Sequence, residues 1–474
     1  MTKAARGATV NAAAADLAAA RAAEVDVPVD IDPETVVGPV VEADAPTPAR
    51  ISKRVFSKPF GIDSMRQFGS HLVVRLWAVD ATEFIRIIVR TKGEASGLTR
   101  VSTLFYSRRD AEEVAGPAAL GLTVVLKDPT LVAGGEIEVM LVTLRDEILV
   151  LRGTPVRDSF HDFFAGVMYD VQRAGRPIEQ RLLFDRSRAL QDLLQSSWGE
   201  YLTEQKQAYI SFGKTYRPAT FSIITVFYRR PFIASIYALT AKILELPPGA
   251  EVVLCFQQAA VFQQQIDYLE GLFRMFQINH RFVLFEENVG FSASNNIGVE
   301  QSSAPRILLV NPDICCNDAS VYEAIAVASD SGDIYGATLL SDADEVMHNG
   351  IELLEQTVVF KSKAIRVMRT SHIGRHSPVE LIEEGEITEA EAVSGALIGV
   401  RRDVWDELGG LPEHFVLAHF EDVEFCRSAT AAGIGVKVYN SRLLIHLESY
   451  GAGEDSLLHA IKQVNSAIFN AGAK

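Results

Sequence analysis

Apolar runs with the length of buried strands alternate with helix-like segments between residues 217 and 310, and this alternation is the strongest constraint on the fold. The runs are Phe221–Tyr228, Glu251–Phe256, His280–Glu286 and Arg306–Val310. The sequence predicts helices between them, over Ile233–Glu245 and Gln263–Phe276. Because strands that alternate with helices are joined by right-handed crossovers, we expect a mostly parallel α/β sheet covered on both faces, within residues 217–474. Ligands of such sheets bind beyond the carboxyl ends of the strands.

Two segments on the carboxyl side of these strands carry candidate binding groups. The fourth strand ends in Asn311-Pro312-Asp313, which places a carboxylate at the edge of a buried strand, where a metal ion and a diphosphate would meet. Upstream, residues 287–298 predict a turn that opens a helix rich in small polar residues. Gly290 permits a tight turn, and the exposed amides of a helix start suit an anionic group. Each signal is common by itself, so the order of motifs along the chain decides their meaning.

Further motifs follow toward the C-terminus. They are Ala392–Arg402, which contains Ser394-Gly395-Ala396, then Leu408–Pro412, Phe420–Arg427 with its Glu421-Asp422 pair, and Ile445–Gly451 with His446. Together with Asn288–Gly298 and Asn311–Asp313, this series resembles the GT-A glycosyltransferases of family 2, in particular the bacterial rhamnosyltransferase-like branch. The resemblance covers residues 217–451, about half of the chain, and implies a Rossmann-like GT-A domain.

The resemblance also implies an activity. Such enzymes are inverting, metal-dependent glycosyltransferases, which here would move a hexosyl or deoxyhexosyl group from a nucleotide-sugar donor, as in polysaccharide biosynthesis. The acceptor hydroxyl would belong to a glycan, a lipid-linked acceptor or a protein. By analogy, Asp422 would be the general base that takes the proton of that hydroxyl, and Glu421 would orient the acceptor. Asp313 and His446 would hold Mg²⁺ or Mn²⁺, which neutralises charge on the departing diphosphate.

The resemblance implies that the nucleotide sugar binds at the first strand and at polar groups that follow it in the chain. The expected contacts are Thr225, Tyr228, Gln257, Asn296, Asn311, Asp313 and Gly395. One departure concerns the turn after the second strand, where family members carry an aspartate that reads the base and this chain has Gln257-Gln258. The absence of that carboxylate leaves an alternative open, in which the chain is a non-catalytic, glycosyltransferase-like binding or assembly subunit.

Residues 51–155 predict a small all-β, sandwich-like accessory domain. Short β-type runs separated by turn residues indicate antiparallel strands. The runs are Leu72–Val79, Phe84–Val89, Val101–Tyr106, Leu122–Leu126, Ile137–Leu144 and Ile148–Leu151. No catalytic constellation occurs among them, so two roles remain: a carbohydrate-binding or docking module, and a structural or oligomerisation domain. We favour the second, because a fold by itself carries no function.

The segments on either side of the β region are predicted to be a disordered tail, residues 1–50, and a helical connector, residues 156–216. The tail is rich in Ala, Pro and Asp and lacks aromatic residues, so it buries too little surface to become ordered, apart from a short helix over Ala12–Ala23. In the connector, Phe160–Met168 and Leu190–Leu202 present apolar faces with helical spacing. We expect these faces to pack the β region against the α/β region, or to form a seam in a homo-oligomer.

Charge and composition limit the partners. Lys and Arg number 45 against 61 Asp and Glu, and the net charge of −16 argues against a general nucleic-acid or anionic-membrane surface. The 4 cysteines lack CxxC spacing and form neither a disulfide framework nor a zinc site. No apolar stretch approaches the ~18 residues that span a bilayer, and the N-terminus lacks a signal-peptide core, so we expect a cytoplasmic protein. A lipid-linked acceptor would then require peripheral membrane contact through the β region or a partner.

Overall fold

The computed structural model describes residues 54–91, 101–107, 109–127, 135–145, 147–173, 188–360, 363–447 and 456–472. All of these residues belong to one unit, Val36–Lys474. The predicted tail, residues 1–50, and the end of the last motif, residues 448–451, lie outside the described residues. Among the helices of the described ranges, none combines the length and the apolar character that a membrane span needs.

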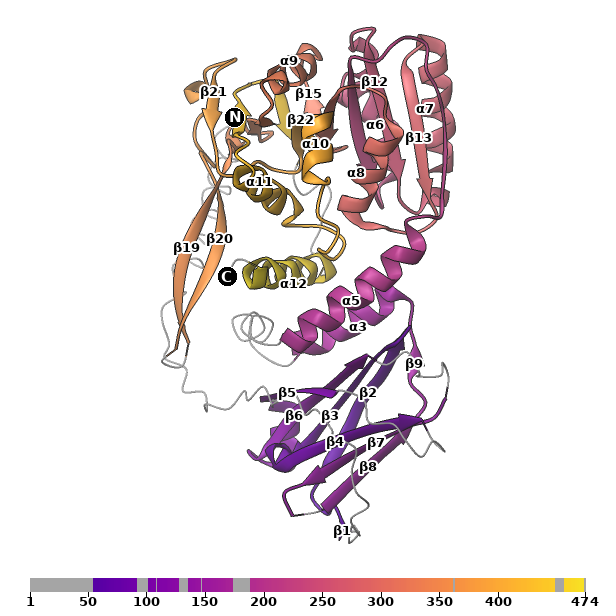
Figure 1. Cartoon of the computed structure of the whole chain (residues 1–474), viewed down its shortest axis with the longest axis vertical. Coiled ribbons are helices and arrows are strands. Elements are labelled where there is room, and N and C mark those ends of the chain that lie inside the picture. The colour runs from indigo at the N-terminus through magenta and orange to yellow at the C-terminus, as the bar shows by residue number, and fades with distance from the viewer. Residues whose placement is uncertain are drawn as a thin grey trace, which may run out of the picture. The chain divides into compact units, whose positions relative to one another are not determined.

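Two sheets form the region between residues 54 and 157 (Figure 1). One has the order β5 (Val101–Ser107), β6 (Ala119–Lys127), β3 (His71–Val79), β2 (Phe60–Phe68), β9 (Val156–Arg157). The other has the order β1 (Arg54–Val55), β8 (Glu147–Gly153), β7 (Ile137–Thr143), β4 (Phe84–Thr91). One apolar cluster contains side chains from both sheets, among them Leu72 and Leu76 of β3 and Val139 and Leu141 of β7. The two sheets therefore pack against each other through this cluster.

All six strands predicted in this region are present, and the longest elements that were not foreseen are a strand and a helix. Strand β2 begins with mostly exposed residues and carries a bulge between Ile62 and Ser64, so its sequence lacks a regular apolar alternation. A short helix, α2 (Arg109–Ala115), lies between β5 and β6. The division of the chain into domains at residues 51 and 155 stays a prediction.

Within the predicted connector, residues 156–216, lie two helices, α3 (Phe160–Arg173) and α5 (Arg188–Gln205). The buried guanidinium of Arg75, on β3, donates to the carbonyl of Val167 on α3, with Nη2 2.7 Å from the oxygen. On the other side, Trp198 Nε1 of α5 donates to the carbonyl of Glu413 at 2.8 Å, and the Tyr201 hydroxyl donates to the carbonyl of Asn288 at 3.1 Å. The connector therefore contacts both regions of the chain.

A nine-stranded sheet forms the centre of the α/β region. Its order is β10 (Tyr209–Lys214), β13 (Asn279–Phe285), β12 (Ala250–Phe256), β11 (Phe221–Phe227), β14 (Arg306–Val310), β22 (Leu397–Arg401), β16 (Ile334–Ala337), β23 (Val436–Tyr439), β21 (Ile387–Glu389). The strands from β13 to β14 pair in parallel, as do β16 and β23, whereas the pairings of β10, β21 and β22 are antiparallel. The prediction of a mostly parallel sheet therefore holds for the centre only, and the complete sheet is mixed. Beyond β14 the strands no longer alternate regularly with crossover helices, which parallel neighbours require.

Helices cover both faces of this sheet, as predicted. Val252 and Leu254 share an apolar cluster with α6 (Pro231–Thr240) and α7 (Gln263–Phe276). The alternate residues Val253 and Cys255 belong to a cluster that includes α8 (Gly290–Gln301), because successive side chains of a strand point to opposite faces. A Cβ atom at Gly298 would lie 2.6 Å from Ile224 Cγ2, so the glycine allows α8 to approach the sheet closely.

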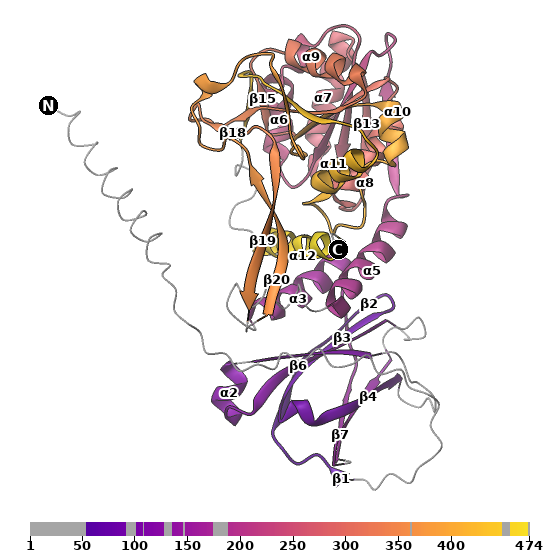
Figure 2. The same cartoon turned by 60° about the vertical axis from the view of Figure 1, so that its left-hand side comes forward.

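Smaller elements complete the region beyond the end of β14. A second sheet has the order β15 (Ile314–Cys316), β24 (Leu444–His446), β17 (Leu339–Leu340), β18 (Val346–His348). A hairpin follows, formed by β19 (Ile351–Phe360) and β20 (Lys363–His372). The remaining helices are α9 (Ser320–Ala328), α10 (Arg402–Leu408), α11 (Glu421–Ala431) and α12 (Ser456–Gly472). Figures 1 and 2 both show α12 beside the hairpin.

Candidate active site

A carboxylate and an imidazole meet where β14 ends. Asp313 follows β14, and the next strand, β15, pairs with β24 so that Ile314 lies opposite His446. The amide of Leu447 also donates to the carbonyl of Asp313 at 3.0 Å. This backbone pairing brings His446 Nε2 to 3.4 Å from Asp313 Oδ1. The structure therefore brings the two predicted metal ligands together.

The chemistry of this pair fits a divalent cation. Asp313 Oδ1 is buried and has no hydrogen-bond partner among the described residues, although a buried carboxylate oxygen normally has one. No cluster of three or more His, Cys, Asp or Glu side chains arranged for a metal occurs within the described ranges. A cation held here would thus take few ligands from the protein, as Mg²⁺ does when substrate phosphates and water complete its shell.

The predicted base, Asp422, lies in the first turn of α11. Its Oδ2 accepts a hydrogen bond from the amide of Gly395 at 2.7 Å, and its Oδ1 accepts one from the amide of Val423 at 2.8 Å. Burial raises the pKa of Asp422, while these two amides act in the opposite direction. A carboxylate whose pKa is moved toward neutrality is better matched to proton transfer than an exposed one. Asp422 also lies in the first turn of α11, where a negative charge interacts favourably with the helix dipole.

Glu421, the residue before it, is in a different state. Its side chain is 5% exposed, and its Oε2 has no hydrogen-bond partner within the described part of the chain. Burial, and then the charge of Asp422, raise the pKa of Glu421 well above its usual range. Of the two carboxyl groups, Glu421 is the one whose burial favours the protonated form more strongly, and a protonated carboxyl group can donate a hydrogen bond.

The backbone in front of α11 has an unusual conformation. Leu417, His419 and Phe420 have φ angles of 61°, 85° and 75°, in the left-handed region that non-glycine residues rarely adopt. The amide of Phe291, on α8, donates to the carbonyl of Leu417 at 2.6 Å. Such backbone persists only where its surroundings hold it, and it gathers at functional sites.

One segment connects the cation pair with the carboxyl pair. The amide of Asn311 donates to the carbonyl of Ala396 at 2.8 Å, while the neighbouring Gly395 donates to Asp422. Gly395 was predicted to contact the nucleotide sugar, but its amide is already used by Asp422. This hydrogen bond fixes the orientation of the Asp422 carboxylate.

Two histidines that the sequence analysis did not select lie between these pairs. Their Nδ1 atoms, in His348 at the end of β18 and His372 at the end of β20, are 2.8 Å apart. The amide of Ser394 donates to His348 Nε2 at 3.2 Å, so His348 carries its proton on Nδ1 and donates it to His372. Burial lowers the pKa of His348 to about 3, and the charges of His372 and His446 act in the same direction. In its protonated form, His372 would in turn act to lower the pKa of Asp422, against the effect of burial.

Two of the predicted nucleotide contacts have polar groups that already pair with other residues of the chain. Thr225 is fully buried, and its hydroxyl lies 2.8 Å from that of Tyr237, so it has no surface to offer a nucleotide. The amide of Asn296 is occupied by the loop after α10: Nδ2 donates to the Leu411 carbonyl and to Glu413 Oε1, and Oδ1 accepts from the amide of Leu411. Both residues support the fold, because their polar atoms are already paired.

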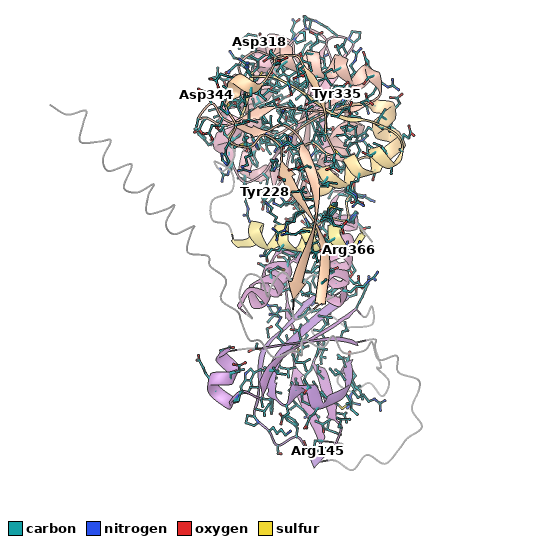
Figure 3. All side chains as sticks on the ribbon, turned by 90° about the vertical axis from the view of Figure 1, so that its left-hand side faces the viewer. Arg145, Tyr228, Asp318, Tyr335, Asp344 and Arg366 are labelled. Atoms are coloured by element: carbon teal, nitrogen blue, oxygen red, sulfur yellow. The ribbon has the colours of Figure 1, made fainter. Side chains whose placement is uncertain are left out.

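The other predicted contacts lie at strand ends, as expected. Tyr228 follows β11, is half-buried, and is labelled in Figure 3. Gln257 follows β12; its Nε2 donates to the carbonyl of Gly290 at 3.2 Å, while its buried Oε1 has no partner among the described residues. Asn311 is half-buried beside Asp313. These three positions and Asp313 end neighbouring strands of the sheet, where a ligand of such a sheet binds.

Comparison with known proteins gives only weak likenesses. No protein-family model matches the sequence, and no curated protein matches it significantly. Among solved structures, the chain is similar to GalNAc-T7 with UDP, GalNAc and Mn²⁺, at 13% identity and a TM-score of 0.35, over 52% of this chain and 48% of that chain. It is also similar to residues 1–349 of S. aureus TarS, at 14% identity and a TM-score of 0.34, over 54% of this chain and 72% of that chain. Likenesses at this level do not assign an activity.

Proposed function

We propose that this protein is an inverting, metal-dependent glycosyltransferase that moves a hexosyl or deoxyhexosyl group from a nucleotide-sugar donor to a hydroxyl group. The observation that carries the proposal is the connection between the two pairs. Residues 394–396 join the Asp313–His446 pair to the Glu421–Asp422 pair through hydrogen bonds to Asn311 and Asp422. A cation ligand and a base that are linked through one short segment are what a transfer between a diphosphate leaving group and a hydroxyl nucleophile requires.

The donor half of the proposed site consists of strand ends. Asp313 and His446 would hold Mg²⁺ or Mn²⁺, which supplies positive charge against the diphosphate. Tyr228 provides an aromatic face for the nucleobase of the donor. Gln257 Oε1 has no donor among the described residues, so it can accept a hydrogen bond from an N–H group of the nucleobase. This use of Gln257 does not need the aspartate that the family has at the same turn. The acceptor would be a glycan, a lipid-linked sugar or a protein.

The acceptor half consists of the two carboxyl groups. Asp422 accepts the proton of the attacking hydroxyl as its oxygen bonds to the anomeric carbon and the bond from that carbon to the diphosphate breaks. Glu421, in its protonated form, donates a hydrogen bond that orients the acceptor. Attack from the face opposite to the leaving group inverts the anomeric configuration.

Metal-dependent nucleotide binding tests the proposal. We expect one of UDP, GDP, CDP, ADP and dTDP to raise the melting temperature in the presence of Mn²⁺ and to lose this effect with EDTA. A ligand at 100 times its dissociation constant should stabilise the folded state by about 2.7 kcal/mol. The corresponding nucleotide sugar should then release its diphosphate slowly, by transfer to water. Binding without any release or transfer would favour the binding or assembly subunit, and no binding to any of the five would overturn the proposal.

A further inference from the structure

The strained segment before α11 is held by one side chain of the C-terminal helix. Asn465, on α12, is fully buried. Its Oδ1 accepts from the amide of Val416 at 2.9 Å, and its Nδ2 donates to the carbonyls of Val416 and Ala418 at 2.8 and 2.6 Å. All three hydrogen bonds thus go to the backbone of residues 416–418, directly before the left-handed residues His419 and Phe420.

An aromatic contact reinforces this hold one turn further along α12. The ring of Phe469 stacks on that of Phe420, with centroids 5.3 Å apart and an interplanar angle of 29°. The guanidinium of Arg427, on α11, lies 5.1 Å from the centroid of the Phe469 ring. Phe420 is the residue before Glu421, so α12 contacts the chain on both sides of the strained backbone. The starting direction of α11 is therefore set by α12.

We propose that Asn465 is a positioning residue, which holds residues 416–420 in the conformation that aims Asp422 at the acceptor hydroxyl. This inference rests on the proposed function, because it concerns the base of that reaction. Left-handed backbone at three non-glycine residues is costly, and without the amide the segment can relax to ordinary φ angles. Relaxation there would move the carboxyl groups of residues 421 and 422 together. Asp313 and His446 would not move, because the pairing of β15 with β24 holds them.

A second asparagine of α12 provides a matched control. Asn470 Oδ1 accepts from the amide of Met368 at 2.6 Å, and its Nδ2 donates to the carbonyl of the same residue at 3.3 Å. Met368 belongs to β20, so Asn470 binds backbone with the same chemistry but does not touch the segment before α11. The two asparagines separate a general loss of α12 packing from a specific loss of the base position.

The experiment compares Asn465→Ala and Asn470→Ala in the full chain. Binding is measured with the nucleoside diphosphate that stabilises the wild type most, and kcat with the corresponding nucleotide sugar as donor. We expect Asn465→Ala to lower kcat about 10²-fold at saturating donor, since a displacement of about 1 Å costs that much. Its dissociation constant for the nucleoside diphosphate should stay unchanged. Asn470→Ala should keep kcat close to that of the wild type. Asn465→Asp keeps the shape and the acceptor for Val416 but lacks the two donors, so it carries the test if the alanine variant does not fold.

Hydrogen exchange gives a readout that does not depend on activity. Amides of residues 416–420 should exchange faster in Asn465→Ala and Asn465→Asp, and at the wild-type rate in Asn470→Ala. Unchanged exchange in the Asn465 variants, unchanged kcat, or an equal loss of kcat in Asn470→Ala would each overturn the inference. A wild type that binds no nucleotide would instead overturn the proposed function, while the exchange result would still report on Asn465.

Discussion

The two halves of the proposed site are held in place by different kinds of structure. Asp313 and His446 are brought together by strand pairing, in which the backbone of β15 and β24 makes the hydrogen bonds. Glu421 and Asp422 follow a left-handed segment that side chains and single amides hold. Backbone pairing depends little on side-chain identity, whereas a conformation held by side-chain contacts is lost when one of these side chains is changed. The base should therefore be easier to misplace than the cation pair.

The largest expected effect is the loss of transfer in Asp422→Asn. The amide keeps the size of the carboxylate but cannot accept the proton, and a positioned base contributes about 10²- to 10⁴-fold in rate. We expect kcat to fall by that factor at saturating donor, while the donor dissociation constant stays the same. Glu424→Gln is the control, because Glu424 lies on the same helix and pairs with Arg427 at 3.4 Å. Equal losses of binding and rate would make Asp422 a structural residue.

The donor half is tested by Asp313→Ala. Removal of the carboxylate should abolish the Mn²⁺-dependent stabilisation by nucleoside diphosphate, about 2.7 kcal/mol at 100 times the dissociation constant, without unfolding the protein. Asp318→Ala is the matched control: Asp318, labelled in Figure 3, is exposed and accepts a hydrogen bond from the amide of Ser320. Thermal shift with and without Mn²⁺ measures both variants. Unchanged metal dependence in Asp313→Ala would place the cation elsewhere.

The contrast between the halves also explains what the sequence could predict. Asp313 could be placed from the sequence because β14 is a clearly apolar strand, and a residue directly after such a strand lies at the edge of the sheet. Thr225 and Asn296 also lie in the expected elements, but a sequence does not show that Tyr237 and Leu411 already pair with their polar groups. His348 was missed because only the folded chain brings it to His372.

The fold shows the same limit. The buried strands of the sheet centre were predicted to within two residues, since burial on both faces gives an unbroken apolar run. The edge strand β10 was missed, because half of its residues are polar or glycine and its neighbours in sequence give no alternation. The segment before α11 could not be predicted at all. Its conformation is imposed by Asn465, which lies 49 residues beyond Val416 and 47 beyond Ala418 along the chain.

The raised pKa of Glu421 predicts a pH dependence of stability. Its pKa is raised in the folded protein, so its contribution to stability is complete below the pKa of the unfolded chain and is lost as pH rises through the folded value. Over that window the free energy of unfolding should fall by about 1.4 kcal/mol per pH unit. Glu421→Gln, which cannot ionise, should show a flatter decline of melting temperature above pH 5. An equally steep decline in the variant would mean that Glu421 is ionised in the fold.

The smallest expected effect concerns acid stability, and it separates the site from the rest of the molecule. Burial lowers the pKa of His348 to about 3 and that of His71, on β3, to about 4, so each contributes stability above the usual histidine pKa that is lost as pH falls toward the folded value. Replacement of either histidine by asparagine should therefore reduce the loss of unfolding free energy between pH 6.5 and 5 by about 1.4 kcal/mol per pH unit, which appears as a smaller loss of melting temperature. Other buried histidines keep part of this pH dependence in both variants.

Only His348→Asn should also change the rate. Its partner His372 acts on the pKa of Asp422, whereas the ring of His71 forms a hydrogen bond with Ser196 of α5. If His348→Asn kept the wild-type pH–rate profile, the histidine pair would have no effect on Asp422, and only the backbone amides would determine its state.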